Sequence, residues 1–201
     1  MNSHSSGVWT SDGMNDILIA GSLILLRDRL PSDVDAFVRW QTRGEWRLFD
    51  APWEGLQTSL TEAQEAELRK RFLETCATEQ PVPRTGAIIA TNAGRPIGWV
   101  NRYAQERLPD IWLVGISIGE DDHLGRGFGS QALRLWVDYL FANSAAHRIG
   151  LDTWSFNRRM ICVAKKTGFV YEGAQRHMIR WQGQWQDLVH FGKLREEGQG
   201  E

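Results

Sequence analysis

Three glycines at alternate positions, Gly125, Gly127 and Gly129, form the part of this chain that is best suited to bind phosphate. The apolar run 111–118 precedes them, and the run 130–141, with apolar residues at helical spacing, follows them. Glycines leave backbone N–H groups unshielded, and a helix that starts here directs its positive end at the same place. The segment therefore predicts a strand, a loop and a helix that hold the pyrophosphate of a cofactor.

This loop differs from the two common nucleotide-binding motifs. The dinucleotide fingerprint is G-x-G-x-x-G, but here the third glycine comes one position early and the loop lies past the middle of the chain. The Walker A motif continues with Lys and Ser/Thr, where this chain has Ser130 and Gln131. From the loop alone, an ordinary glycine-rich turn between a strand and a helix remains open.

A second segment of the chain indicates which class of cofactor the glycine loop binds. It contains His147-Arg148-Ile149, Asn157, Lys166-Thr167-Gly168-Phe169 and Glu172-Gly173, in that order. Together with Leu124-Gly125-Arg126-Gly127-Phe128-Gly129, it resembles the two signature motifs of the GNAT superfamily of acyl-CoA N-acyltransferases. The resemblance is closest to the RimJ/RimL-like branch of ribosomal-protein N-terminal acetyltransferases and covers roughly residues 22–195. It implies acetyl-CoA (coenzyme A) as the cofactor and an amine as the acceptor.

The resemblance also implies the architecture. We expect an α/β GNAT fold with a single mixed, mostly antiparallel twisted sheet of six to seven strands and about four helices, splayed at the central strands. A single domain is expected over 16–201, after a disordered polar tail over 1–15. Ser32 is the expected N-cap of the first helix. Strands are predicted at 23–29, 85–91, 97–103, 111–118, 147–155, 170–179 and 185–194, and helices at 32–41, 59–77, 130–141 and 158–167.

Composition limits the function classes. The 201 residues are 42% hydrophobic, which suits one domain with a real core, and the net charge of −2 gives no reason to expect nucleic acid or a membrane as partner. Cys76 and Cys162 are far apart, so we expect no metal site, and Cys162 is predicted to be a reduced, buried thiol in a helix. The apolar run 17–26 follows acidic residues and is too short to span a bilayer. These features favour a cytoplasmic protein.

The resemblance assigns the cofactor to two elements. Backbone N–H groups of the glycine loop are expected to bind the pyrophosphate, with Arg126 either adding charge or lying free in solvent. The strand before the loop is expected to pair with the pantetheine arm and to polarise the thioester carbonyl, with Gly115 at a bulge or close approach. Asn157 suits a helix N-cap and, by resemblance, a contact with the arm. The expected cofactor-binding residues are Ile116, Ser117, Ile118, Leu124, Gly125, Arg126, Gly127, Phe128, Gly129, Ser130, Asn157 and Lys166.

The sequence defines the catalytic acid and the catalytic base less well than the cofactor-binding residues. Many members of the family have a tyrosine that protonates the leaving thiolate, and this chain has Ala164 there. A thiol of pKa about 8.5 is already a fair leaving group, so this absence is compatible with activity. Glu120 and Ser155 are the first catalytic candidates. Further candidates for the base, each better suited to a solvated or structural role, are Glu45, Asp50, Glu54, His123 and Asp152.

The acceptor is predicted from the ionisation of amines. Without a strong base the amine must supply its own neutral fraction, which favours an α-amino group over a lysine side chain. Aromatic and acidic residues on and near the stretch 43–58 suit a cationic acceptor, and the expected substrate-binding residues are Trp46, Trp53, Glu54 and Trp99. An aminoglycoside or polyamine acetyltransferase, a non-catalytic acyl-CoA-binding module and a homodimer remain open.

Overall fold

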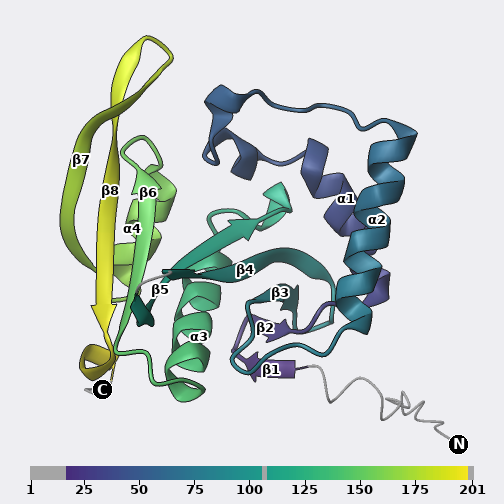
Figure 1. Ribbon diagram of the computed structural model, residues 1–201, viewed down its shortest axis with the longest axis horizontal. Helices are drawn as coiled ribbons and strands as arrows, with labels where there is room; N and C mark the ends of the chain where they lie inside the picture. The colour runs from purple at the N-terminus through teal and green to yellow at the C-terminus, as the bar shows by residue number, and fades with distance from the viewer. Residues whose placement is uncertain (1–16, 106–107, 199–201) are drawn as a thin grey trace, which may run out of the picture.

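The computed structural model describes residues 17–105 and 108–198, and these form one mixed sheet with helices packed on it (Figure 1). The strand order is β1-β2-β3-β4-β5-β6-β8-β7. The strands are β1 (Ile17–Ala20), β2 (Ile24–Arg27), β3 (Gly86–Thr91), β4 (Pro96–Gln105), β5 (Leu108–Ile118), β6 (Arg148–Trp154), β7 (Val170–Trp181) and β8 (Gln184–Leu194). The α-helices in the described ranges are α1 (Val34–Thr42), α2 (Glu62–Ala77), α3 (Phe128–Ala142) and α4 (Arg158–Lys166).

The predicted fold class is confirmed, with two local corrections near the start of the chain. The sheet has eight strands instead of six to seven, because Gly21 and Ser22 turn the apolar run into the β1–β2 hairpin. Ser32 does not cap α1 but lies inside a 3-10 turn, Pro31–Asp33, that leads into the helix. The expected disordered tail over 1–15 lies outside the described residues.

The expected splay lies between β5 and β6. These strands pair in parallel only from Ile111–Leu113 to Arg148–Gly150, and then each continues for several residues without the other. β6 remains paired with β8 along its whole length, and β5 remains paired with β4. The backbone groups of β5 that face the gap therefore lack a strand partner, which opens the sheet at its centre.

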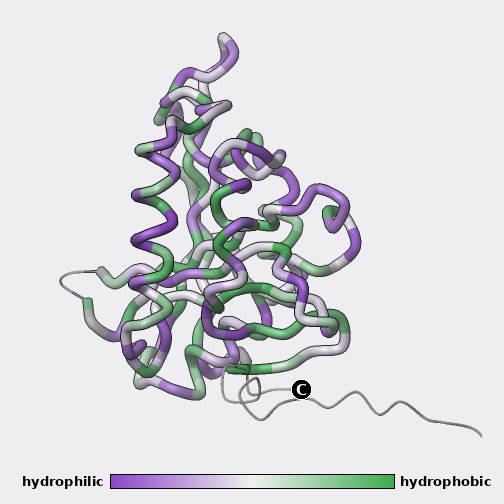
Figure 2. The backbone as a smooth tube through the Cα atoms, turned by 90° about the vertical axis from the view of Figure 1, so that its right-hand side faces the viewer, coloured by the Kyte–Doolittle hydropathy of each residue, from purple (hydrophilic) through white to green (hydrophobic). Residues whose placement is uncertain are grey.

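Helix α3 supplies the core that holds the sheet together beneath the splay. Leu133, Trp136 and Leu140 are fully buried against strand residues such as Ile89 and Ile149. The Trp136 indole N–H also donates to the Asn101 carbonyl at 3.1 Å, which ties the helix to β4. By contrast, α2 lies on the side of the molecule that faces the viewer in Figure 2 and is largely hydrophilic, with Phe72 as its buried residue. No helix in the described ranges is long and apolar enough to cross a membrane.

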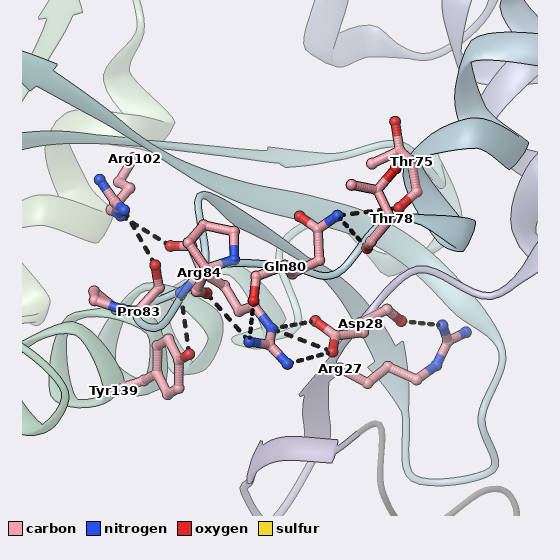
Figure 3. A network of polar contacts seen from close by, with 10 residues as sticks. Arg27, Asp28, Thr75, Thr78, Gln80, Pro83, Arg84, Arg102 and Tyr139 are labelled. Carbon is pink, nitrogen blue, oxygen red and sulfur yellow. Dashed lines mark hydrogen bonds and ion pairs between the residues drawn. The ribbon is translucent and has the colours of Figure 1, made fainter.

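An arginine network fixes the segment between α2 and β3 (Figure 3). Arg84 binds the Asp28 carboxylate through Nε and Nη2, each at 2.9 Å, and its backbone N–H donates to the Tyr139 hydroxyl at 3.1 Å. Arg102 donates to the Arg84 carbonyl at 2.9 Å. These contacts connect the end of β2, the segment before β3, the strand β4 and the helix α3.

Candidate active site

A cavity of about 860 Å³ lies where β5 and β6 splay. Its walls come from both strands, the glycine loop, α1, α4 and the stretch 43–58. Most of the predicted cofactor-binding residues are brought together here, and they are Ile116, Ser117, Ile118, Leu124, Gly125, Gly127, Gly129, Ser130, Asn157 and Lys166. Among the predicted site residues, those outside the lining are Trp53, Glu54, Glu120, Arg126, Phe128 and Ser155.

The glycine loop has the geometry of an anion cradle. Gly125 and Gly127 adopt positive φ values of 72° and 87°, which favour glycine. The Gln131 N–H is bonded to the Gly127 carbonyl at 3.0 Å, and the three N–H groups before it lie in the first turn of α3, where a helix has no carbonyl to offer. A Cβ atom on Gly125 would meet nothing within 4 Å. The loop therefore has free donors, open space and a helix N-terminus, all of which fit a pyrophosphate.

The strand β5 presents its unpaired edge to the cavity next to the glycine loop. Gly115 lies opposite Asn101 in an unbroken part of the β4–β5 register, so it does not form a bulge. A Cβ atom there would collide with the Asn101 side chain, which confirms the predicted close approach. Asn101 Nδ2 donates to the Tyr103 hydroxyl at 2.7 Å, and both side chains belong to residues that line the cavity.

Helix α4 forms the opposite wall. The Asn157 side chain accepts the Met160 N–H at 3.1 Å, which confirms the predicted N-cap. Cys162, Val163 and Lys166 lie at helical spacing on the side that lines the cavity. The prediction that Cys162 is buried is therefore wrong: its residue is exposed, because this face of α4 borders the cavity instead of the core.

The stretch 43–58 is fastened across the splay to the start of α4. Glu45 forms an ion pair with Arg159 at 2.7 Å, and the Phe49 ring stacks on Phe156 with centroids 6.2 Å apart. Trp53 packs edge-on against Trp154, with centroids 4.7 Å apart. The predicted wall residue Trp53 therefore serves to attach the stretch to β6, and the exposed Glu54 lies beyond the cavity.

Two of the predicted substrate-binding residues, Trp46 and Trp99, line the cavity and pack together. Trp46 meets Trp99 edge-on with ring centroids 4.9 Å apart, and Trp99 stacks on the fully buried Trp40. Trp46 Nε1 is buried without a hydrogen-bond partner in the described ranges. Asn101 lines the cavity but is not among the predicted site residues, although the period of two along β4 places it on the same face as Trp99 and Tyr103.

The two leading catalytic candidates are engaged in structural contacts. Glu120 accepts from Arg39 and from Trp40 Nε1, the latter at 2.8 Å, and lies 3.4 Å from Arg95. Burial alone would raise the pKa of Glu120, but the hydrogen bonds and the arginine charges outweigh it and hold that pKa below its usual value. Ser155 donates to Gln186 at 3.0 Å and accepts the Asp187 N–H at 3.1 Å.

Substituting Glu120 tests whether it is a base or a structural anchor. We expect Glu120→Gln to keep kcat/KM within about threefold, whereas loss of a true general base costs about 10²–10⁴-fold. The free energy of unfolding at pH 7 should fall by about 1–3 kcal/mol, because hydrogen bonds to a charged group are lost. Since the folded-state pKa is lowered, this contribution is present above the unfolded pKa of about 4.3 and is lost as the pH falls through the folded pKa. Urea unfolding of both proteins at pH 7 and at pH 4 measures the difference, which should be smaller at pH 4.

Sequence comparison identifies the family. Residues 24–170 match the acetyltransferase (GNAT) domain family, and the chain belongs to it. The chain is similar to the SPbeta prophage-derived uncharacterized N-acetyltransferase YokL of Bacillus subtilis, with 30% identity over 101 residues that cover 50% of this chain and 56% of that protein. The match thus spans little more than half of that relative. The putative ribosomal N-acetyltransferase YdaF of the same species is 24% identical over 161 residues, 80% of this chain and 82% of that protein.

Solved structures show the same fold at low identity. A GNAT-family acetyltransferase from Bacillus anthracis has a TM-score of 0.69 at 18% identity, covering 89% of this chain and 98% of that one. A ribosomal-protein-S5-alanine acetyltransferase from Vibrio fischeri gives 0.67 at 22%, covering 89% and 96%. An aminoglycoside acetyltransferase in complex with coenzyme A gives 0.64 at 21%, covering 87% and 96%. These likenesses show the fold, and the family match shows that the chain is an acetyltransferase (GNAT) domain, a family whose acetyltransferases use acetyl-CoA.

Proposed function

We propose that this protein transfers the acetyl group of acetyl-CoA to the α-amino group of a protein or peptide in the cytoplasm, as the RimJ/RimL-like branch does. The observation that carries this proposal is the charge balance in the acceptor half of the cavity. Asp50 and Asp152 are the carboxylates among the described lining residues, and the nearby Glu45 and Glu120, which lie outside the lining, are each paired with arginine. The remainder of this half is largely aromatic, formed by Phe37, Trp46, Phe49, Trp99 and Tyr103.

This balance suits an acceptor with one positive charge followed by an apolar or neutral chain. Polyamines and aminoglycosides carry several ammonium groups. The lining offers them two carboxylates but also carries the cations Arg158, Arg159 and Lys166, which repel a polycation. A peptide N-terminus carries one such group. The residues that follow it can lie along the wall formed by Trp46 and Trp99, whose ring centroids are 4.9 Å apart.

The residues of the cavity then have separate tasks. The N–H groups of 125–130 hold the pyrophosphate, and the free edge of β5 over 116–118 pairs with the pantetheine arm and donates to the carbonyl oxygen that becomes negative. Asn157 and Lys166 border the arm from α4. When bound, acetyl-CoA supplies the activated acetyl thioester. The splay lets acceptor and donor meet from opposite faces of the sheet, so we propose direct attack in a ternary complex.

Amine ionisation gives this proposal a numerical expectation. At pH 7 an α-amino group with a pKa near 8 is neutral in roughly one molecule in ten, whereas a lysine amine near 10.4 is neutral in fewer than roughly one in a thousand. We therefore expect kcat/KM at pH 7 to favour the α-amine by about 100-fold. A peptide that carries both a free N-terminus and an internal lysine compares the two amines in one reaction, with the acetylated position mapped by fragmentation mass spectrometry.

The alternative acceptors enter the same experiment as competitors. Spermidine and kanamycin, each added at a concentration equal to that of the peptide, should leave the peptide as the main acetylated product. An N-terminally blocked version of the peptide is the matched control and should react at background rate. Preferential acetylation of spermidine or kanamycin would replace our proposal with a small-molecule N-acetyltransferase.

A further inference from the structure

One carboxylate in the acceptor half is held in place by a second side chain. Asp152 lies on β6 and lines the cavity, and its direct partner in the antiparallel register is His190 on β8. His190 Nδ1 lies 2.8 Å from Asp152 Oδ1, and Oδ2 has no hydrogen-bond partner in the described ranges. The Asp152 side chain is 34% exposed and the His190 side chain 27%, so both are partly removed from water.

Asp152 also lies on the sheet face from which an acceptor would approach. Its neighbours Leu151 and Thr153 are buried, which places Asp152 on the opposite face of β6 by the period of two. Trp154 shares that face and contacts Trp53 of the stretch 43–58. The Asp152 side chain is thus directed toward the acceptor side, next to the gap along which β5 exposes its backbone.

The other base candidates lack this combination of access and support. Glu45 is paired with Arg159, and Glu120 with Arg39. His123 bonds Asp122 at 2.7 Å and packs on Phe128 beside the glycine loop. Asp50 lines the cavity, but its side chain has no supporting hydrogen bond among the described contacts. Asp152 is therefore the candidate that both faces the cavity and is oriented by a neighbour.

Charged groups around this pair are largely neutralised. On the same half of the sheet, Arg148 pairs with Glu172 at 2.5 Å. The Asp187 carboxylate accepts the His177 N–H at 2.9 Å. Arg158 and Arg159 line the opposite wall, and Arg159 is paired with Glu45. Neither Glu172 nor Asp187 lines the cavity. Asp152 thus keeps one carboxylate oxygen free beside the gap.

We propose that Asp152, oriented by His190, binds the acceptor amine in its neutral form and accepts the proton that the nitrogen loses as it is acetylated. This inference rests on the proposed function and names a residue that acts in it. The amine nitrogen uses its lone pair to form the bond to the acetyl carbon while the carbon–sulfur bond breaks and the thiolate leaves. The proton passes from that nitrogen to Asp152 Oδ2 and on to solvent, and the thiolate takes a proton from water. His190 is a positioning residue, because it touches Asp152 and does not line the cavity.

The test compares Asp152→Asn with Glu172→Gln. Both remove one negative charge from the same half of the sheet, and only the first removes a carboxylate from the cavity. Asparagine retains an oxygen that can accept from His190, so the fold should persist. We expect Asp152→Asn to lose about 100-fold in kcat/KM for an N-terminal peptide, the lower end of the range for general acid–base groups. Glu172→Gln should keep kcat/KM within about threefold, and coenzyme A affinity measured by calorimetry should match the native value in both variants.

His190 is tested by rescue. We expect His190→Ala to reduce kcat/KM by about tenfold, because Asp152 loses its orienting partner, and His190→Asn to recover most of it, because its amide can donate from a place near Nδ1. A merely structural role for His190 would lower thermal stability and activity together in both variants. In our account the two variants differ in kcat/KM while their coenzyme A affinities agree.

The outcomes separate this inference from the proposed function. If the native protein acetylates the peptide and Asp152→Asn does so at the native kcat/KM, the inference is wrong and the proposed function stands. If the native protein acetylates no amine although it binds coenzyme A, the proposed function fails and the role of Asp152 fails with it. A loss confined to Asp152→Asn, with partial loss in His190→Ala and rescue in His190→Asn, supports both.

Discussion

Replacing Gly127 with valine is expected to weaken coenzyme A binding by about 100-fold. Gly127 adopts φ +87° directly before α3, a conformation that costs a residue with a Cβ atom about 1–2 kcal/mol. Relief of this strain moves the N–H groups that the pyrophosphate needs, and each hydrogen bond to a charged group contributes about 1.5–3 kcal/mol. A combined loss of about 3 kcal/mol corresponds to the stated factor. Isothermal titration calorimetry measures the affinity of the native protein and of the variant for coenzyme A.

Gly94→Val is the matched control for this prediction. Gly94 has φ +85° in the turn between β3 and β4, and a Cβ atom there would meet nothing within 4 Å, so the backbone strain is similar. Gly94 does not line the cavity. Both variants should lose similar thermal stability, but Gly94→Val should bind coenzyme A as the native protein does. Equal affinities of the two variants for coenzyme A would show that the glycine loop is an ordinary turn.

Replacing Asp33 with asparagine is expected to destabilise the protein by about 3–5 kcal/mol, since it leaves a buried charge without its partner. The Arg27 and Asp33 side chains are 6% and 1% exposed, and their two hydrogen bonds are 2.6 and 2.7 Å long. Asp33 also accepts the Leu30 N–H at 2.8 Å and so fixes the entry into α1, which carries the cavity residues Phe37 and Gln41. Urea unfolding at pH 7 measures the loss.

Asp35→Asn provides the comparison two residues further along. Asp35 also bonds an arginine, Arg69, at 2.6 Å, but its side chain is 76% exposed. Ion pairs at such positions contribute about 0–1 kcal/mol, so Asp35→Asn should unfold almost as the native protein does. Similar losses in the two variants would contradict the assignment of the Arg27–Asp33 pair as the anchor of α1.

Local patterns predicted well the helices that follow the glycine loop and β6. The apolar spacing after Gly129 placed a helix at 130–141, and α3 extends over Phe128–Ala142. Asn157 was predicted as an N-cap from its residue type, and its side chain has that role. These features depend on neighbours within a few positions, so the sequence contains the information directly.

The acceptor half depends on contacts between distant residues, and there the predictions were weaker. Glu120 follows the central strand as a base could, but Arg39 and Trp40 from α1 bind it. Trp53 lies on a charged stretch where an exposed wall seemed natural, but its partner is Trp154 on β6. Neither pairing has a local signal. The support of Asp152 by His190 likewise depends on the register between β6 and β8, which only the fold determines.

The central claim is that this cavity transfers an acetyl group from acetyl-CoA to an α-amine, and one measurement tests it most directly. Release of free thiol from acetyl-CoA is followed with a peptide that carries a free N-terminus and no lysine, over pH 6 to 9, alongside its N-terminally blocked counterpart. We predict that thiol release requires the free N-terminus and matches the acetylated peptide mole for mole. It should rise with pH through the amine's pKa of about 8 and level off above it. Equal thiol release with the blocked peptide, or none with either peptide from a protein that binds coenzyme A, would contradict the account.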